Sequence, residues 1–137
     1  MSDSESFGAN HTPYDRLGGE APVLALAERF YDAMDEHEPE LARLHPLENG
    51  KVSRASRDRF GLFLIGWLGG PQEYMRRHGH PRLRMRHGHV PVTSAMREAW
   101  MRCMRIALDH PDIDPELRAY LDEKLGDVAT MLRNQPS

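Results

Sequence analysis

Apolar side chains recur at helical spacing along most of the chain. The first clear stretch runs from Pro22 to about Met34. Its apolar positions lie three or four residues apart, which predicts a helix with one buried face, and they are Val23, Ala27, Phe30, Tyr31 and Met34. Pro22 is suited to the first helical turn, where a missing N–H is tolerated. Gly18 and Gly19 interrupt helical structure before this helix.

A second helix is predicted between Ser53, which can cap its N-terminus, and the Gly69-Gly70-Pro71 sequence that ends it. Its apolar stripe consists of Phe60, Phe63, Leu64, Trp67 and Leu68. Its first turns are charged, and we expect these side chains to be exposed: Arg54, Arg57, Asp58 and Arg59.

Two further helices follow in the last third of the chain. Thr93 or Ser94 caps the first, whose stripe is Met96, Ala99, Trp100, Cys103, Met104, Ala107 and Leu108. Asp114-Pro115-Glu116 begins the second with a cap, a first-turn proline and a first-turn acid. Its stripe is Leu117, Tyr120, Leu121, Leu125, Val128, Ala129 and Leu132.

The connecting segments are short. We expect a helical turn at 41–44 and a loop at 47–52 with Asn49-Gly50 as its turn. Because no long stretch alternates with period two, the predicted fold class is all-α. Residues 1–13 are polar and are expected to form a disordered arm before one domain at 14–134.

The composition argues against several classes of protein. The net charge is −3 with both signs interspersed, so no nucleic-acid partner is expected. The single cysteine, Cys103, excludes an intramolecular disulfide and suits a reducing compartment. The longest apolar run, 62–68, is shorter than the roughly 20 residues that span a bilayer. With no signal peptide expected in the polar N-terminal residues, we predict a cytoplasmic protein without a membrane partner.

Candidate chemistry gathers in the basic segment 76–89. It contains five arginines and four histidines, which are Arg76, Arg77, Arg82, Arg84 and Arg86, and His78, His80, His87 and His89. Solvated surface residues are one interpretation. A zinc or copper site is another, although cysteine and a His-Glu-x-x-His helix are absent nearby.

Several sequence motifs occur in an order that resembles a known protein family. The order is Arg29-Phe30-Tyr31, Phe63-Leu64, Trp67-Leu68-Gly69-Gly70-Pro71, Gly79 to His87, and Glu98 to Met104. From Tyr14 to about Asn134 the chain is similar to the group II truncated haemoglobins. This resemblance implies a globin-like two-over-two helical sandwich around haem b.

Position by position, the resemblance implies that His87 is the proximal ligand of the haem iron, a role for which a histidine is common. Arg84, Arg86 and Tyr74 are candidates for binding the haem propionates, with simple solvation as the alternative for the arginines. Leu83, Val90 and Val92 are expected to touch the ring on the proximal side.

On the distal side the resemblance places Tyr31 and Trp100, whose O–H and N–H can donate hydrogen bonds to a bound ligand. Periodicity alone would make both ordinary core residues. His45 is a candidate third donor, with a surface histidine as the alternative. The small side chain of Ser56 would leave an open route to the haem iron. Phe60, Phe63 and Leu64 are expected to wall the pocket.

The expected ligands are dioxygen, nitric oxide or other small molecules. Several distal donors favour redox chemistry on oxygen, nitric oxide or peroxide, as a nitric oxide dioxygenase or a peroxidase-like protein that depends on an external reductase. A non-catalytic carrier for oxygen transport or a sensor remains an alternative, and so does a helical interaction module without haem. The expected oligomeric state is a monomer or a weak homodimer.

Overall fold

The computed structural model describes residues 12–82 and 92–133. In chain order the elements are α2 (Pro13–Leu17), α3 (Glu20–His37), α4 (Pro39–Ala42), β1 (Leu47–Glu48), β2 (Lys51–Val52), α5 (Arg54–Trp67), α6 (Glu73–His78), α8 (Ser94–Leu108) and α9 (Pro115–Leu132).

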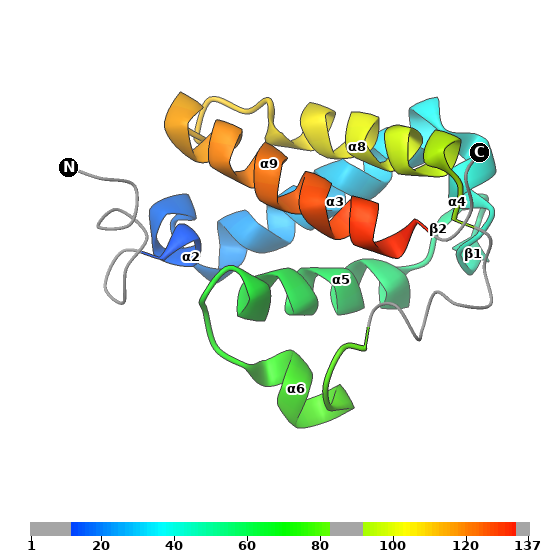
Figure 1. The fold of residues 1–137 in the computed structure, drawn as a ribbon. Helices are drawn as coiled ribbons and strands as arrows, with labels where there is room; N and C mark the ends of the chain where they lie inside the picture. Colours follow the sequence, from blue (N-terminus) through cyan, green and yellow to red (C-terminus); the bar gives the residue numbers. More distant parts are fainter. Residues whose placement is uncertain (1–11, 83–91, 134–137) are drawn as a thin grey trace.

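Four long helices form two packed pairs. Helix α3 packs against both α5 and α8, and α8 packs against α9. In Figure 1, α8 and α9 lie side by side above α5, and the short α6 lies below α5. The predicted all-α, two-over-two arrangement is confirmed. Its core is centred on α3, where Val23, Leu26, Phe30 and Met34 are almost completely buried.

The predicted caps explain where the helices begin. In each cap a side-chain oxygen accepts a hydrogen bond from the backbone N–H three residues later: Ser53 Oγ from Ser56, Thr93 Oγ1 from Met96, and Asp114 Oδ1 from Leu117. Helix α5 ends before Gly69, whose φ of +101° lies in the left-handed region that glycine adopts without strain. These three N-terminal caps and this stop fix the helices that surround the site.

The helix boundaries differ from the predictions at the N-terminal end. Helix α2 begins at Pro13 and is capped by Thr12, two residues that the prediction had placed in the N-terminal arm. Helix α3 runs from Glu20 to His37 and is longer than predicted at both ends.

Helix α6 was not predicted, because its six residues include only Tyr74 and Met75 as apolar residues and show no stripe.

The segment 47–52 is a small hairpin instead of an irregular loop. Leu47 pairs with Val52 and Glu48 with Lys51 in antiparallel register. Asn49 and Gly50 both have positive φ, which matches the turn that two-residue hairpins prefer. Two-residue strands are too short for an alternating pattern to reveal them.

Two side chains of α5 do not lie where the sequence predicted. Arg57 was expected to be exposed, but it is only 6% exposed because carboxylates of α3 surround its guanidinium. Trp67 was placed on the buried stripe, but it is 36% exposed at the end of the helix.

Candidate functional site

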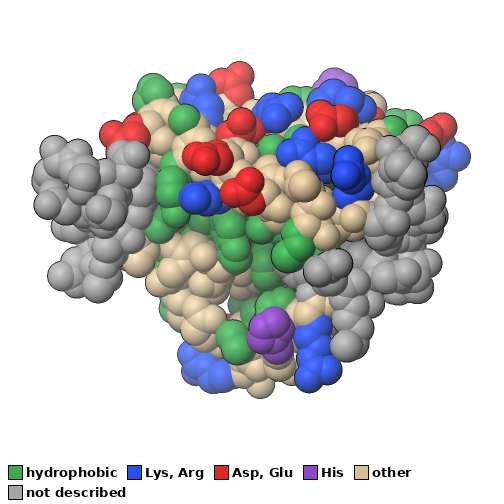
Figure 2. Space-filling view, in the orientation of Figure 1, with side chains coloured by type: hydrophobic (Ala, Val, Ile, Leu, Met, Phe, Trp, Pro, Cys, Tyr) green, Lys and Arg blue, Asp and Glu red, His purple; other side chains and the backbone are tan. Residues whose placement is uncertain are grey.

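A large cavity lies between α5 and the α8–α9 pair. Its volume is about 730 Å³, and its walls are mainly apolar. Figure 2 shows the surface hollowed above α6, with hydrophobic side chains around the opening. Each of the four long helices contributes to the lining, and the full set is Tyr31, Leu41, Leu44, His45, Pro46, Ser53, Ala55, Ser56, Arg59, Phe60, Phe63, Trp67, Tyr74, Val92, Met96, Arg97, Trp100, Leu125, Val128, Ala129 and Leu132.

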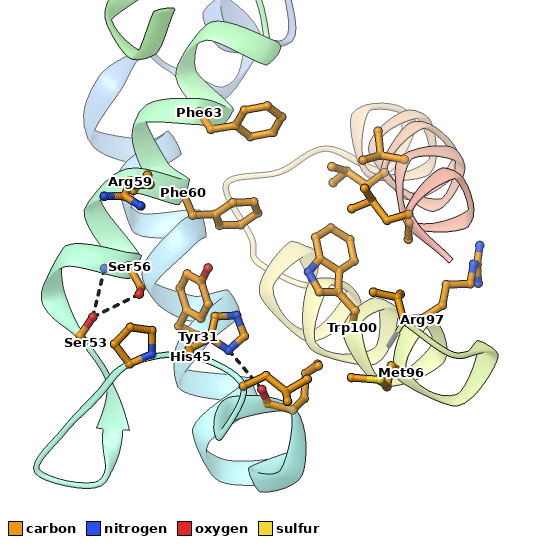
Figure 3. A pocket seen from close by; sticks show the side chains of 18 of the residues that line it. Tyr31, His45, Ser53, Ser56, Arg59, Phe60, Phe63, Met96, Arg97 and Trp100 are labelled. Carbon is orange, nitrogen blue, oxygen red and sulfur yellow. Dashed lines mark hydrogen bonds between the residues drawn. The ribbon is translucent and has the colours of Figure 1, made fainter. Parts of the chain in front are cut away.

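Aromatic rings form two facing sides of the cavity. Phe60 and Phe63 of α5 are stacked, with ring centroids 6.3 Å apart. Trp100 of α8 meets Phe60 edge to face at 6.3 Å and Phe30 at 5.0 Å. Figure 3 shows Phe60 and Phe63 directed toward Trp100 from the opposite side. These rings give the space inside the cavity an aromatic, apolar wall.

Tyr31 places a phenol at one end of this space. The residue is 6% exposed, and its ring packs edge to face on Phe30, Phe60 and His45 at centroid distances of 4.9, 5.6 and 5.6 Å. Burial raises the pKa of the Tyr31 phenol well above its usual range, and Arg57 opposes this shift only partly. The phenol therefore keeps its proton and can donate a hydrogen bond.

His45 lies beside Tyr31 at the same end (Figure 3). Its Nδ1 is 3.1 Å from the carbonyl oxygen of Leu41, and because a carbonyl only accepts, Nδ1 is the donor. The hydroxyls of Ser53 and Ser56 complete this end and are hydrogen-bonded at 3.1 Å. This end of the cavity is therefore its polar end.

Two arginines lie at the border of the cavity. Arg97 is anchored, because Nε donates to Thr130 Oγ1 at 2.9 Å and a terminal nitrogen donates to Gly126 O at 3.2 Å. Arg59 is exposed and lines the cavity. Its guanidinium has no ion pair with a carboxylate of residues 12–82 or 92–133, so it can receive an anionic group.

Tyr74 closes the side formed by α6. It is 5% exposed and packs edge to face on Phe63 at 6.0 Å. His78, one turn later, covers its other side at 5.0 Å. The short helix thus contributes one buried aromatic residue to the cavity, while Arg76 and Arg77 on it are solvent-exposed.

The structure brings together most of the described residues that the sequence singled out for the site. Those lining the cavity are Tyr31, His45, Ser56, Phe60, Phe63, Tyr74, Val92 and Trp100. Leu64 does not join them, because it is completely buried in the core on the other flank of α5. Leu83, Arg84, Arg86, His87 and Val90 lie outside the described residues.

Sequence reasoning missed several lining residues. The apolar residues of α9 that border the cavity, Leu125, Val128, Ala129 and Leu132, had been assigned only to a core-facing stripe. Arg59, Met96 and Arg97 had no distinguishing signal. A stripe that faces a cavity has the same spacing as one that faces another helix.

The described residues give two further findings. In the ranges 12–82 and 92–133, no three His, Cys, Asp or Glu side chains gather as a metal site would require. In the same ranges, none of the helices is apolar over a length sufficient to cross a bilayer.

Comparison with known proteins assigns the family. A sequence model of the bacterial-like globins matches residues 12–134. A group 2 truncated haemoglobin of Bacillus subtilis is 35% identical over 131 residues, which cover 96% of this chain and 92% of that protein.

Solved structures agree with this assignment. The cold-adapted truncated haemoglobin of Pseudoalteromonas haloplanktis is 43% identical with a TM-score of 0.83, covering 90% of this chain and 98% of that one. The group II truncated haemoglobin of Bacillus anthracis is 32% identical with a TM-score of 0.83, covering 92% and 93%. The chain therefore belongs to the bacterial-like globins and is a haem-binding truncated haemoglobin of group II.

Proposed function

We propose that this chain binds haem b in the cavity through His87, and that it carries out redox chemistry on dioxygen, nitric oxide or peroxide with electrons from an external reductase. One observation carries the proposal: a 730 Å³ cavity with aromatic walls has a buried phenol and an indole on its lining. We place the haem-binding domain at 14–134, in a cytoplasmic protein that is monomeric or weakly dimeric.

The residues present fit a haem group. Protein interiors are close-packed, so an apolar cavity of this size in a small chain indicates a bound ligand. Its volume lies within the roughly 300–1,000 Å³ typical of ligand pockets. Phe60, Phe63 and Trp100 give the cavity an aromatic wall against which a flat aromatic group can pack, and Arg59 suits an acidic substituent at the border.

The proximal side of the site is assigned to the segment that contains His87. Val92, the first described residue after that segment, lines the cavity, and Tyr74 lines it from the helix that precedes the segment. In the proposal Nε2 of His87 would hold the iron, and Arg84, Arg86 and Tyr74 would bind the propionates. Leu83, Val90 and Val92 would pack against the haem ring on the side of His87.

The distal side is assigned to Trp100 and Tyr31, with His45 as a third polar group. When bound, the haem iron supplies the position at which a diatomic ligand binds and accepts or releases electrons. The protein then contributes aimed donors: the Tyr31 phenol keeps its proton at neutral pH, and an indole N–H donates at every pH. Such donors stabilise negative charge on a ligand and slow its release.

Slow release favours turnover over delivery. A carrier has to give its ligand up quickly, whereas a protein that reacts bound ligand with a second molecule benefits from retaining it. Nitric oxide dioxygenation and peroxide reduction are therefore the leading activities, and oxygen transport or sensing is the alternative. The family assignment argues against a helical interaction module without haem.

The proximal assignment is tested by paired histidine variants. His87→Ala is expected to abolish stable haem retention, measured as the Soret absorbance per protein after desalting. His89→Ala is the matched control, two residues away in the same segment, and is expected to retain haem. Equal haem content and unchanged ferrous spectra in His87→Ala would refute the assignment.

The redox role is tested by turnover. Oxygenated protein is mixed with nitric oxide in the presence of a flavin reductant, and nitrate is measured over many equivalents. Repeated nitrate formation supports the proposed activity. Rapid dioxygen release without nitrate formation would favour the carrier or sensor alternative.

A further inference from the structure

A charged cluster lies between α3 and α5, directly behind the distal wall of the cavity. Its centre is Arg57, which is 6% exposed. Its terminal nitrogens donate to three carboxylates of α3: Glu28 at 3.0 Å, Asp32 at 2.7 Å and Asp35 at 2.5 Å. None of these four residues lines the cavity, so contact with the cofactor or its ligand does not account for the cluster.

The cluster lies next to Tyr31. Glu28, Asp32 and Asp35 are spaced at i, i+4 and i+7, and Tyr31 at i+3 belongs to the same helical face. The Arg57 guanidinium lies over the Tyr31 ring, with Cζ 5.9 Å from the ring centroid. This distance is within the range of cation–π contacts. The ring is therefore held by a cation in addition to its aromatic neighbours.

The same cluster fixes the β1–β2 hairpin. The backbone N–H of Val52 donates a hydrogen bond to Asp35 Oδ1 at 3.1 Å. The carbonyl oxygen of Val52 accepts a hydrogen bond from Arg57 Nε at 2.9 Å. Ser53, the next residue, donates its amide to the carbonyl oxygen of Pro46 at 2.9 Å. Pro46 follows His45, so the chain carrying the polar end of the cavity is tied to Arg57 through two successive residues.

We propose that Arg57 is a positioning residue for the distal donors, holding the Tyr31 ring and the hairpin so that the phenol is aimed into the cavity. The inference rests on the proposed role of Tyr31 as a donor to the bound ligand. Arg57 and Asp35 are both nearly buried, and a buried ion pair is often no more stabilising than apolar residues of the same volume, so stability alone is a weak reason for this pair. Fixing one geometry for a nearby donor is a reason that the contacts support.

The test compares Arg57 variants with a matched control. Arg57→Met removes the charge and the hydrogen bonds, and Arg57→Lys keeps the charge but cannot bridge three carboxylates and a carbonyl together. Arg54→Met is the control, because Arg54 also pairs with Glu28 but its side chain is 57% exposed and it has no contact with Tyr31. Asp35→Asn is a milder variant that keeps an acceptor for Val52 and weakens the contact with Arg57.

Three measurements on the haem-loaded full chain report the position of Tyr31. They are the dioxygen release rate, the C–O stretching frequency of the ferrous carbon monoxide complex, and the NMR signals of the Tyr31 ring in that diamagnetic complex. For Arg57→Met we expect roughly two- to tenfold faster release, the range that one lost hydrogen bond covers. We also expect a higher C–O frequency and faster flipping of the Tyr31 ring, with smaller changes in the same direction for Arg57→Lys and Asp35→Asn.

A double-mutant cycle separates this inference from the proposed function. On a Tyr31→Phe background, Arg57→Met is expected to leave release almost unchanged, because the donor that it positions is gone. If Tyr31→Phe alone speeds release but Arg57→Met, Arg57→Lys and Asp35→Asn do not, the inference is wrong and the donor role stands. If Tyr31→Phe has no effect, the donor role fails, and the inference fails with it. An Arg54→Met effect as large as that of Arg57→Met would also overturn the inference.

Discussion

Replacing Trp100 with phenylalanine gives the sharpest test of the distal site. Trp100 meets Phe30 at a centroid distance of 5.0 Å and an interplanar angle of 61°, and Phe60 at 6.3 Å and 78°. A phenyl ring at position 100 can preserve these edge-to-face contacts. The change therefore removes mainly the indole N–H and part of the ring that lines the cavity.

The magnitude follows from the hydrogen bond that is lost. A neutral hydrogen bond is worth about 1 kcal/mol net, and one to a charged acceptor about 1.5–3 kcal/mol. Because the charge on a diatomic ligand is partial, we take about 1–2 kcal/mol, which corresponds to a factor of roughly 5–30. The dioxygen release rate of Trp100→Phe is expected to rise by this factor.

The assay is stopped-flow release from the oxygenated protein into an excess of a competing ligand. Trp67→Phe provides a matched control, since Trp67 also lines the cavity but lies at the end of α5 and is 36% exposed. Its release rate is expected to stay within about twofold of the parent, the small effect of a change at an exposed position. The donor role of Trp100 is refuted if Trp100→Phe releases dioxygen at the parent rate, or if both variants change the release rate equally.

Two further predictions concern the protein outside the cavity. The hydrogen bonds from Arg102 lower the pKa of the Glu38 carboxyl, so the folded state holds fewer protons at this site than the unfolded chain. Its stabilising contribution is present above the ordinary carboxyl range and lost as pH falls through it, so the free energy of unfolding should decrease below about pH 4 less steeply in Glu38→Gln, as measured by urea unfolding. Burial raises the pKa of the Cys103 thiol to about 11, and the thiol is expected to resist a disulfide reagent at neutral pH until denaturant is added; rapid labelling of the folded protein would contradict this.

The main helices could be predicted because their signals are local. Ser53, Thr93 and Asp114 cap their helices through the amide three residues later, a contact that depends only on neighbouring sequence. Helix α6 and the hairpin at 47–52 were not predicted, because six-residue helices and two-residue strands carry no usable periodicity. Local sequence also gave no sign that Arg57 is buried, since its carboxylate partners lie more than twenty residues earlier.

The site itself was predictable only as far as polarity distinguishes a cavity from a core. Phe60 and Leu64 belong to one stripe of α5, but Phe60 lines the cavity and Leu64 is buried against other helices. Hydrophobic periodicity reports removal from water, and removal by a cofactor has the same signature as removal by a side chain. What sets the cavity wall apart is the polar atom that a closed core would leave unpaired. Tyr31 and Trp100 each have such an atom, so both could be singled out from the sequence. The link between Arg57, which lies behind Tyr31, and the site could not be predicted. The residue that we propose aims the donor is charged, and only the packing of α5 on α3 places it within 5.9 Å of the ring.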